Sequence, residues 1–379
     1  MLKKVIVFLL AAALLTASLT AAQAADNGAL ITAPAGVLME ASTGKILYEK
    51  NAHEKRPCAS ITKVMTLLLV FEAMDSGKLR LDDTITAGEH AASMGGSDIW
   101  LEAGETMSAD DMIKATAVAS ANDAAVALAE HISGSEDVFV AQMNERAGQL
   151  GMKDTVFKNC NGLDEEGHVT SAYDVALMSR ELCRHPKIFD YTSIWLDNLR
   201  GGKTQIVNTN KLLKTYNGIT GLKTGTTDDA GCCISATATR GDLSLIGVVL
   251  GADTGKQRFA DAAALLDYGF ANYAVKELKV PEELPAEIKV EGGMEKTAAL
   301  RCEINAGVVV NKASDDEAHS TVSLPESLQA PVEEGEKVGS VIWKIGDDTL
   351  SFDILCEREI PQATFAPVFV RLFDSLIKL

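Results

Sequence analysis

Residues 60–71 of the chain read SITKVMTLLLVF, a polar start followed by a strongly apolar continuation. Apolar residues recur there at helical spacing, at Val64, Leu67, Leu68 and Phe71. We therefore expect a helix that begins at Ser60 and ends before Gly77, since glycine commonly follows a last helical turn. On such a helix Ser60 and Lys63 share one face, so the lysine amine can reach the serine hydroxyl.

The Ser-x-x-Lys spacing occurs three times and does not by itself identify a nucleophile. Residues 42–45 fall between two short apolar runs, in a sequence typical of a β-hairpin turn. Residues 375–378 lie on the polar side of an amphipathic segment. Only Ser60 opens an apolar helix, where the positive helix end and a backbone N–H can face a developing oxyanion. The alternative is that Ser60 is an ordinary N-cap and Lys63 a solvated surface charge.

A second pattern, Ser120-Ala121-Asn122, occurs once. It interrupts the alanine-rich stretch 112–131, which contains no proline or glycine and is expected to be helical. A polar pair has little structural purpose there unless it lines a cleft. The alternative is a buried serine whose hydroxyl bonds back to the helix backbone.

A third pattern, Lys223-Thr224-Gly225, also occurs once and precedes a β-rich run. Its glycine would let a bound backbone approach closely. The alternative is an exposed turn.

The three patterns in this order resemble the motif set of penicillin-binding proteins and serine β-lactamases. More closely, residues 57–63 (PCASITK), 159–163 (NCNGL) and 221–227 (GLKTGTT) resemble the low-molecular-mass penicillin-binding proteins that are serine-type D-alanyl-D-alanine carboxypeptidases. The resemblance covers nearly the whole chain. Cys58 and Cys160 stand where that family has proline.

The resemblance implies an α/β fold, in which an antiparallel sheet flanked by helices adjoins a mainly helical subdomain, as in β-lactamases and transpeptidases. Apolar runs at 37–39 and 46–48, and at 232–239 and 244–250, predict two hairpins of that sheet, and 260–268 predicts a closing helix. After about residue 273, short strand-like pieces separated by proline and glycine predict a small all-β sandwich domain.

Four segments are therefore expected. Residues 1–24 have the basic start, apolar run and small-residue end of a secretory signal peptide. A catalytic domain over 25–273 and an all-β domain over 274–362 follow. Residues 363–379 form a C-terminal amphipathic helix, expected to attach the exported protein to the outer face of the cytoplasmic membrane. The alternative is that this helix packs against the β-domain.

The resemblance also implies a role for each motif residue. Ser60 is the acyl-ester nucleophile, Lys63 accepts its proton, Ser120 relays a proton to the leaving amine, and Asn122 orients Lys63 or the substrate. Lys63 must then be neutral, either through burial or through a neighbouring cation such as Lys223.

The N–H groups of Ser60 and Thr226 would form the oxyanion hole. The terminal carboxylate of the substrate would be held by Lys223, Thr224, Gly225, Thr226 and Arg258. For Arg258 the alternative is a surface charge that precedes the closing helix.

The expected partners are a peptidoglycan stem pentapeptide and β-lactam antibiotics. The net charge of −18 and the lack of a Lys/Arg cluster argue against nucleic acid. No metal-ligand pattern is present, and no cofactor is expected. The seven cysteines are an odd number, and we expect mostly buried free thiols.

Three other functions stay open. A β-lactamase carries the same motifs, although no glutamate-bearing loop of the class A type lies between Ser120 and Lys223. A D,D-endopeptidase or transpeptidase would act on cross-links. A catalytically silent peptidoglycan or β-lactam sensor would have lost a motif residue, and none is lost.

Overall fold

The computed structural model of the protein describes residues 30–304, 306–314, 317–346, 348–365 and 369. The chain divides into two compact units between Ala271 and Asn272. Strand β10 (Tyr273–Glu277) lies in the second unit, where it pairs with β13 (Gly307–Asn311). The first unit therefore ends slightly before residue 273, the boundary expected from the sequence.

The first unit contains a five-stranded antiparallel sheet with the order β2-β1-β9-β8-β7. Its strands are β1 (Ala35–Glu40), β2 (Ile46–Lys50), β7 (Ile219–Thr227), β8 (Gly231–Arg240) and β9 (Leu243–Ala252). Both predicted hairpins are confirmed, as β1–β2 and β8–β9. Strand β7 was not predicted, because its glycines and threonines are also typical of a turn.

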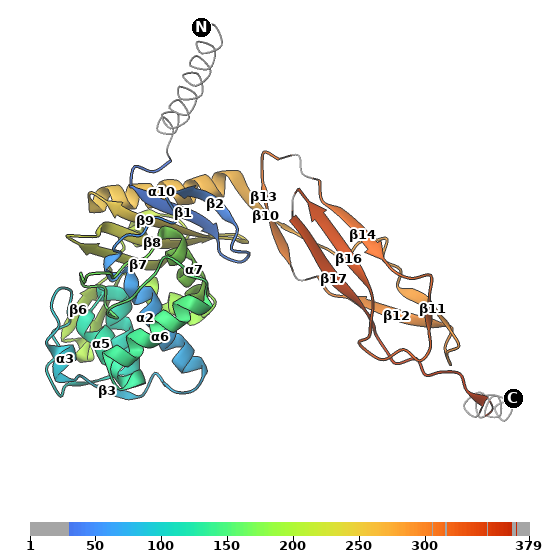
Figure 1. Ribbon diagram of the computed structural model, residues 1–379, viewed down its shortest axis with the longest axis horizontal. Coiled ribbons are helices and arrows are strands. Elements are labelled where there is room, and N and C mark those ends of the chain that lie inside the picture. Colours follow the sequence, from blue (N-terminus) through green and yellow to red (C-terminus); the bar gives the residue numbers. More distant parts are fainter. Residues whose placement is uncertain (1–29, 305, 315–316, 347, 366–368, 370–379) are drawn as a thin grey trace, which may run out of the picture. The chain divides into compact units, whose positions relative to one another are not determined.

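Helix α10 (Gly255–Asn272) covers one face of this sheet (Figure 1). The helix approaches the sheet closely at Gly269, where a Cβ atom would lie 2.5 Å from Leu245 of β9 and 2.9 Å from Leu38 of β1. The predicted closing helix is confirmed and extends beyond residues 260–268 at both ends.

A mainly helical region lies on the opposite side of the sheet, as expected (Figure 1). Its helices are α2 (Lys63–Asp75), α3 (Glu89–Ala92), α4 (Ala109–Lys114), α5 (Asn122–Ser133), α6 (Glu136–Gln149), α7 (Ala172–Cys183), α8 (Phe189–Thr192) and α9 (Leu212–Thr215). Two small hairpins accompany them, β3 (Thr84–Thr86) with β4 (Thr106–Ser108) and β5 (Leu196–Leu199) with β6 (Thr204–Val207). Helix α5 is buried on all sides from Asn122 to Ala129, which explains its small alanine side chains.

The two helical stretches that carry the motifs are each interrupted at the motif, in contrast to the continuous helices predicted from the sequence. Residues Ala59–Thr62 form a 3₁₀ turn, and the α-helix begins only at Lys63. The alanine-rich stretch 112–131 is not continuous either, because a π-helical segment (Ala115–Ala119) ends at Ser120, which adopts a left-handed conformation. Both interruptions fall on the Ser-x-x-Lys and Ser-x-Asn motifs.

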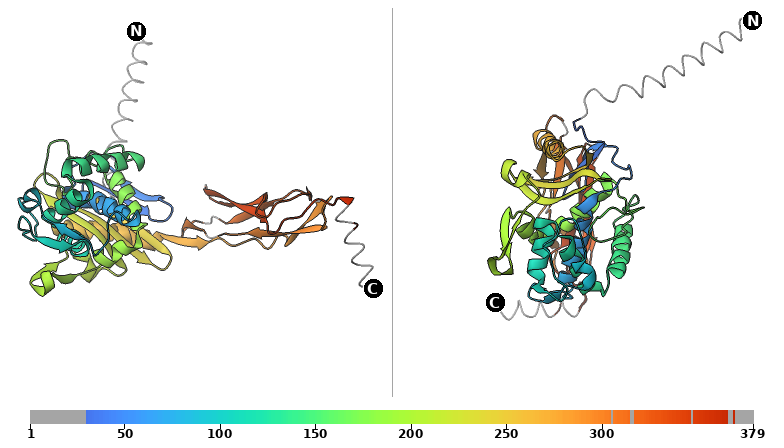
Figure 2. Two further views of the ribbon diagram at one scale, coloured as in Figure 1. Left: turned by 90° about the horizontal axis from the view of Figure 1, so that it is seen from below. Right: turned by 90° about the vertical axis from the view of Figure 1, so that its left-hand side faces the viewer.

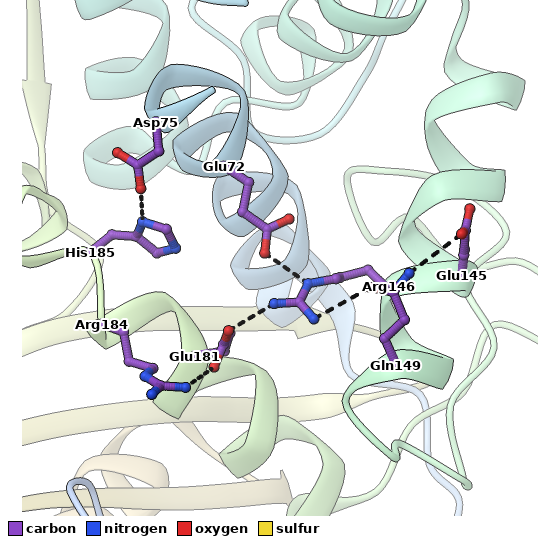
Figure 3. A network of polar contacts seen from close by, with 8 residues as sticks. All are labelled: Glu72, Asp75, Glu145, Arg146, Gln149, Glu181, Arg184 and His185. Carbon is purple, nitrogen blue, oxygen red and sulfur yellow. Dashed lines mark hydrogen bonds and ion pairs between the residues drawn. The ribbon is translucent and has the colours of Figure 1, made fainter. Parts of the chain in front are cut away.

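Three helices of this region are joined by Arg146 of α6 (Figure 3). Its Nε lies 2.7 Å from Glu72 Oε1 of α2, and its Nη2 lies 2.7 Å from Glu181 Oε1 of α7. All three side chains are at least partly shielded from water, which strengthens such an ion pair relative to a fully exposed one. Arg146 thus stabilises the helical region at the end of α2 that is remote from Ser60.

The second unit is built from strands, shown in orange to red in Figure 2. They are β10, β11 (Glu287–Glu291), β12 (Thr297–Cys302), β13, β14 (His319–Ser323), β15 (Ser327–Gln329), β16 (Lys337–Ile345) and β17 (Asp348–Cys356). Six of these form one sheet with the order β14-β16-β17-β12-β11-β15, and β10 pairs with β13. Ile288, Val290 and Ile360 belong to one small core of this unit, and Val308 and Ile345 belong to another. The predicted all-β domain is confirmed.

The predicted signal peptide, 1–24, lies outside the described residues, as does most of the predicted C-terminal helix. Within the described part of the chain, no helix is both long and apolar enough to cross a membrane. All seven cysteines are free thiols, and four of them are buried, as expected. The described residues also contain no group of three or more His, Cys, Asp or Glu side chains placed to hold a metal ion.

Candidate active site

Ser60 lies in a tight and strained turn. Its neighbour Ala59 has a φ of +50°, which is unusual for a residue with a Cβ atom. Such a conformation persists only where the surrounding contacts fix it, and these turns concentrate at functional sites. The N-cap position of the 3₁₀ turn is Cys58 and that of α2 is Thr62, so Ser60 lies inside the turn. Ser60 is therefore not the N-cap that the alternative interpretation required.

Lys63 is fully buried beneath this turn. Its Nζ lies 3.0 Å from Ser60 Oγ, 2.5 Å from Asn122 Oδ1 and 2.7 Å from the carbonyl oxygen of Asn161. Burial lowers the pKa of Lys63 to about 7, although nearby Asp98 and other acidic groups oppose this shift. Burial, rather than the charge of Lys223, is thus the main cause of its low pKa, and the surface-charge alternative is wrong.

Ser120 and Lys223 form a second buried pair. Lys223 Nζ donates a hydrogen bond to Ser120 Oγ at 2.8 Å and another to the Thr224 carbonyl oxygen at 2.8 Å. Burial, together with the neighbouring charges of Lys63 and Arg258, holds the pKa of Lys223 well below its usual range. The hydroxyl of Ser120 thus contacts a distant strand, and within the described part of the chain it makes no hydrogen bond to the backbone of its own helix.

Asn122 links Lys63 to the segment that contains Gly95 and Ser97. Its Oδ1 accepts a hydrogen bond from Lys63, and its Nδ2 donates one to the Gly95 carbonyl oxygen at 2.6 Å. Its backbone N–H donates to the Ser97 carbonyl oxygen at 2.6 Å. Since two of these bonds fix the side-chain amide and the third fixes the backbone, the amide oxygen is held toward Lys63 and the amide nitrogen away from it.

Strand β7 forms the opposite wall. Lys223, Thr224 and Gly225 are buried within this strand, so the exposed-turn alternative is wrong. A Cβ atom at Gly225 would lie 2.7 Å from the Cys58 carbonyl oxygen and 2.8 Å from Ser60 N. Only glycine therefore allows the strand to lie this close to the nucleophile turn. Thr224 Oγ1 lies 2.6 Å from Thr209 Oγ1, and Thr226 is exposed.

Arg258, in the first turns of α10, is only 8% exposed and is not a surface charge. Its Nη1 donates to the Gly225 carbonyl oxygen at 3.0 Å and to Thr226 Oγ1 at 3.0 Å. Its Nε is buried and has no hydrogen-bond partner within the described part of the chain. The structure thus brings a guanidinium group to the end of β7 that carries Thr226.

All nine residues singled out in the sequence lie in or beside one site, formed by the turn before α2, the start of α5, strand β7 and the start of α10. The family of D-alanyl-D-alanine carboxypeptidases matches residues 20–254, well over half of the chain. The chain belongs to this family. It is a serine-type D-alanyl-D-alanine carboxypeptidase of the low-molecular-mass penicillin-binding group. Residues 273–362 match the C-terminal domain of penicillin-binding protein 5.

Individual relatives agree with this assignment. The carboxypeptidase is 41% identical to D-alanyl-D-alanine carboxypeptidase DacF of Bacillus subtilis (strain 168), over 86% of this chain and 85% of that one. Its fold is similar to that of penicillin binding protein 5 from Haemophilus influenzae, with a TM-score of 0.74, 31% identity and coverage of 88% and 98% of the two chains. It is also similar to penicillin-binding protein D2 from Listeria monocytogenes in an ampicillin-bound form, with a TM-score of 0.59, 35% identity and coverage of 64% and 99%.

Sequence reasoning assigned no role to Asn161 and Gly162. The segment that contains them, Asn-Cys-Asn-Gly-Leu, entered only as part of the resemblance, and its contribution to the site is a main-chain carbonyl group. A carbonyl leaves no signature in residue type. The one signal available in the sequence was the glycine at position 162. The structure explains that glycine, because its φ is +86° and a Cβ atom there would lie 2.0 Å from the Ala59 carbonyl oxygen.

We expect Gly162→Ala to lower the rate of acylation of the carboxypeptidase by about 100-fold, because the new methyl group would push the Ala59–Ser60 turn away from Lys63. The rate is measured with a fluorescent penicillin. Gly151→Ala is the matched control, since Gly151 also has a positive φ, +76°, but no atom lies within 4 Å of its Cβ position. Equal acylation rates for the two variants would contradict this prediction.

Proposed function

We propose that Ser60 Oγ attacks the carbonyl carbon between the two terminal D-alanines of a peptidoglycan stem pentapeptide. The observation that supports this most is the environment of Lys63 Nζ. A neutral amine has two hydrogens, and the oxygens of Asn122 and Asn161 accept both. The lone pair is then directed at Ser60 Oγ, 3.0 Å away, where it can accept the hydroxyl proton.

The second step of acylation is assigned to Ser120 and Lys223. When the Ser60 ester bond forms and the peptide C–N bond breaks, the leaving D-alanine nitrogen needs a proton. The hydroxyl of Ser120, hydrogen-bonded to Lys223 Nζ, supplies it, and the proton that Lys63 took from Ser60 Oγ replaces the one that Ser120 gives up. Water then hydrolyses the ester, so that D-alanine and the shortened peptide are the products.

The terminal carboxylate of the substrate is assigned to the end of β7. Thr226 is exposed and is in contact with Arg258, whose positive charge attracts an anion in an otherwise acidic protein. The N–H groups of Ser60 and Thr226 are assigned to the oxyanion hole. Their role is supported by the close approach of β7 to the nucleophile turn at Gly225.

We further propose that β-lactams acylate Ser60, since the similar Listeria protein has a structure in an ampicillin-bound form. The test is to incubate the mature protein with penicillin and to locate the adduct by peptide mass mapping. We expect the adduct on the peptide that contains Ser60 and not on the one that contains Ser42, which shares the same spacing to a lysine. An adduct elsewhere would exclude Ser60 as the nucleophile.

A parallel assay tests the reaction itself with a diacyl-L-Lys-D-Ala-D-Ala peptide. Stoichiometric release of one D-alanine per peptide supports the carboxypeptidase. Cleavage of a cross-linked dimer at a higher rate indicates an endopeptidase, and rapid turnover of penicillin a β-lactamase. A Ser60 adduct without any release of D-alanine indicates a sensor.

Export and membrane attachment are also part of the proposal. The sequence of residues 1–24 supports export, and the amphipathic segment 363–379 supports attachment to the outer face of the cytoplasmic membrane. Phe365 and Phe369, with ring centroids 5.8 Å apart, are both exposed.

We expect deletion of residues 363–379 to shift the protein from the membrane fraction to the soluble fraction, with D-alanine release unchanged. Equal membrane association of the full and shortened chains would contradict the anchor.

A further inference from the structure

His168 is a buried histidine behind the nucleophile turn that no step of the proposed reaction uses. It is 5% exposed, and burial lowers its pKa to about 4, so the ring is neutral near neutral pH. The ring packs edge-on against Phe157, with centroids 5.8 Å apart. A neutral imidazole has one donor and one acceptor nitrogen, and its neighbours decide which is which.

The hydrogen bonds around His168 fix its tautomer. The backbone N–H of Lys158 lies 3.2 Å from Nδ1, and since an N–H group can only donate, Nδ1 is the acceptor. The proton is therefore on Nε2, which lies 2.8 Å from Thr62 Oγ1 and donates to it. The Thr62 hydroxyl in turn donates to the Ala59 carbonyl oxygen at 2.9 Å.

These bonds form a directed chain that ends at the peptide group before Ser60. Each donor and acceptor in it is used once, from Lys158 N–H through His168 and Thr62 to the Ala59 carbonyl. Ala59 is the strained residue of the turn, and its carbonyl oxygen also lies against Gly162. The chain therefore acts on the peptide unit that carries the Ser60 N–H.

We propose that His168 is a positioning residue, which through Thr62 holds the Ala59–Ser60 peptide in the orientation needed for acylation. The inference rests on the proposed role of Ser60 as nucleophile. The described contacts of His168 are with Lys158, Thr62 and Phe157 and not with Ser60. Its loss would therefore change the geometry of the nucleophile and of the Ser60 N–H without removing a group that donates or accepts a proton in the reaction. A misplacement of this kind costs rate without removing a catalytic group.

Two substitutions at His168 separate this role from simple packing. In His168→Gln the side-chain NH₂ can replace Nε2–H as donor to Thr62, whereas in His168→Asn the shorter amide can replace only the Nδ1 acceptor for Lys158. We expect His168→Asn to lower the acylation rate constant at least about tenfold, with KM changed little, and His168→Gln to stay close to wild type. A chain that served folding alone would show similar losses for both.

Arg146→Ala is the control for lost stability. It removes the bridge between three helices at the end of α2 remote from Ser60, so it lowers the melting temperature. Acylation measured well below the melting transition is expected to be unchanged in it. If Arg146→Ala and His168→Asn lost acylation in proportion to their loss of stability, the proposal would be overturned.

A double-mutant cycle with Thr62 completes the test. Thr62→Val keeps the shape of the side chain but removes the hydroxyl, whereas Thr62→Ser keeps the hydroxyl. If the two residues act in one chain, His168→Asn adds little to the acylation loss of Thr62→Val, and Thr62→Ser stays active. Additive losses would overturn the proposal. Mapping the wild-type penicillin adduct to a residue other than Ser60 would instead overturn the proposed function, so the two failures are distinguishable.

Discussion

Replacing Ser60 by alanine is expected to lower the rate of D-alanine release by about 10⁴-fold or more and to abolish covalent labelling by a fluorescent penicillin. The reason is that Ser60 Oγ is the only hydroxyl in contact with Lys63 Nζ within the described part of the chain. The other two partners of Lys63 Nζ are the side-chain oxygen of Asn122 and the carbonyl oxygen of Asn161, and neither carries a proton that Lys63 could remove. Both readouts are measured on the same preparation, against wild type.

Ser42→Ala is the matched control for this substitution. Ser42 also precedes a lysine by three residues, but its hydroxyl contacts the Glu40 carboxylate in the turn between β1 and β2. We expect this variant to retain D-alanine release and labelling. Release that survived in Ser60→Ala, or labelling lost in Ser42→Ala, would show that the nucleophile has been assigned wrongly. A melting curve for each variant confirms that the fold is intact.

The sequence predicted the sheet hairpins, the closing helix and the residues of the site because these depend on local patterns. Alternating and apolar runs defined β1, β2, β8 and β9, and three short motifs defined Ser60, Ser120 and Lys223. Strand β7 did not follow from such a pattern. Its residues are small and polar because the strand lines a site, so tertiary pairing with β8 decides its conformation.

The features that make the site reactive were beyond local prediction. The 3₁₀ turn at Ala59–Thr62 and the left-handed Ser120 both depart from intrinsic preference, and long-range contacts hold them. The low pKa of Lys63 comes from its complete burial, which no residue pattern reports. The carbonyl of Asn161 belongs to the backbone and is therefore invisible in residue type. In each case the tertiary structure adds what the motif lacks.

Lys63→Met is expected to lower the acylation rate by about 10³-fold at pH 8, since the substitution removes the group that accepts the Ser60 proton. In wild type only the neutral amine can act, and the pKa of Lys63 is lowered to about 7 by burial. The acylation rate should therefore rise with pH through about 7 and fall below it. In Lys63→Met this dependence should disappear, whereas Lys45→Met, the control in the Ser42-x-x-Lys45 copy, should keep it.

The lowered pKa of Lys63 also predicts how the free energy of unfolding depends on pH. This dependence has the opposite sign from that of a lysine whose pKa is raised by an ion pair. Because the pKa of Lys63 is about 7 in the folded protein and 10.5 in an unperturbed lysine, the unfolded chain binds more protons between pH 7 and pH 10.5. Stability should thus increase as the pH rises across this window, and less steeply in Lys63→Met, where Lys223 is the buried amine that remains among the described residues. Chemical denaturation at several pH values measures this slope. An unchanged slope together with an acylation profile that persists in Lys63→Met would mean that Lys63 is charged when buried, and would assign the role of base to another group.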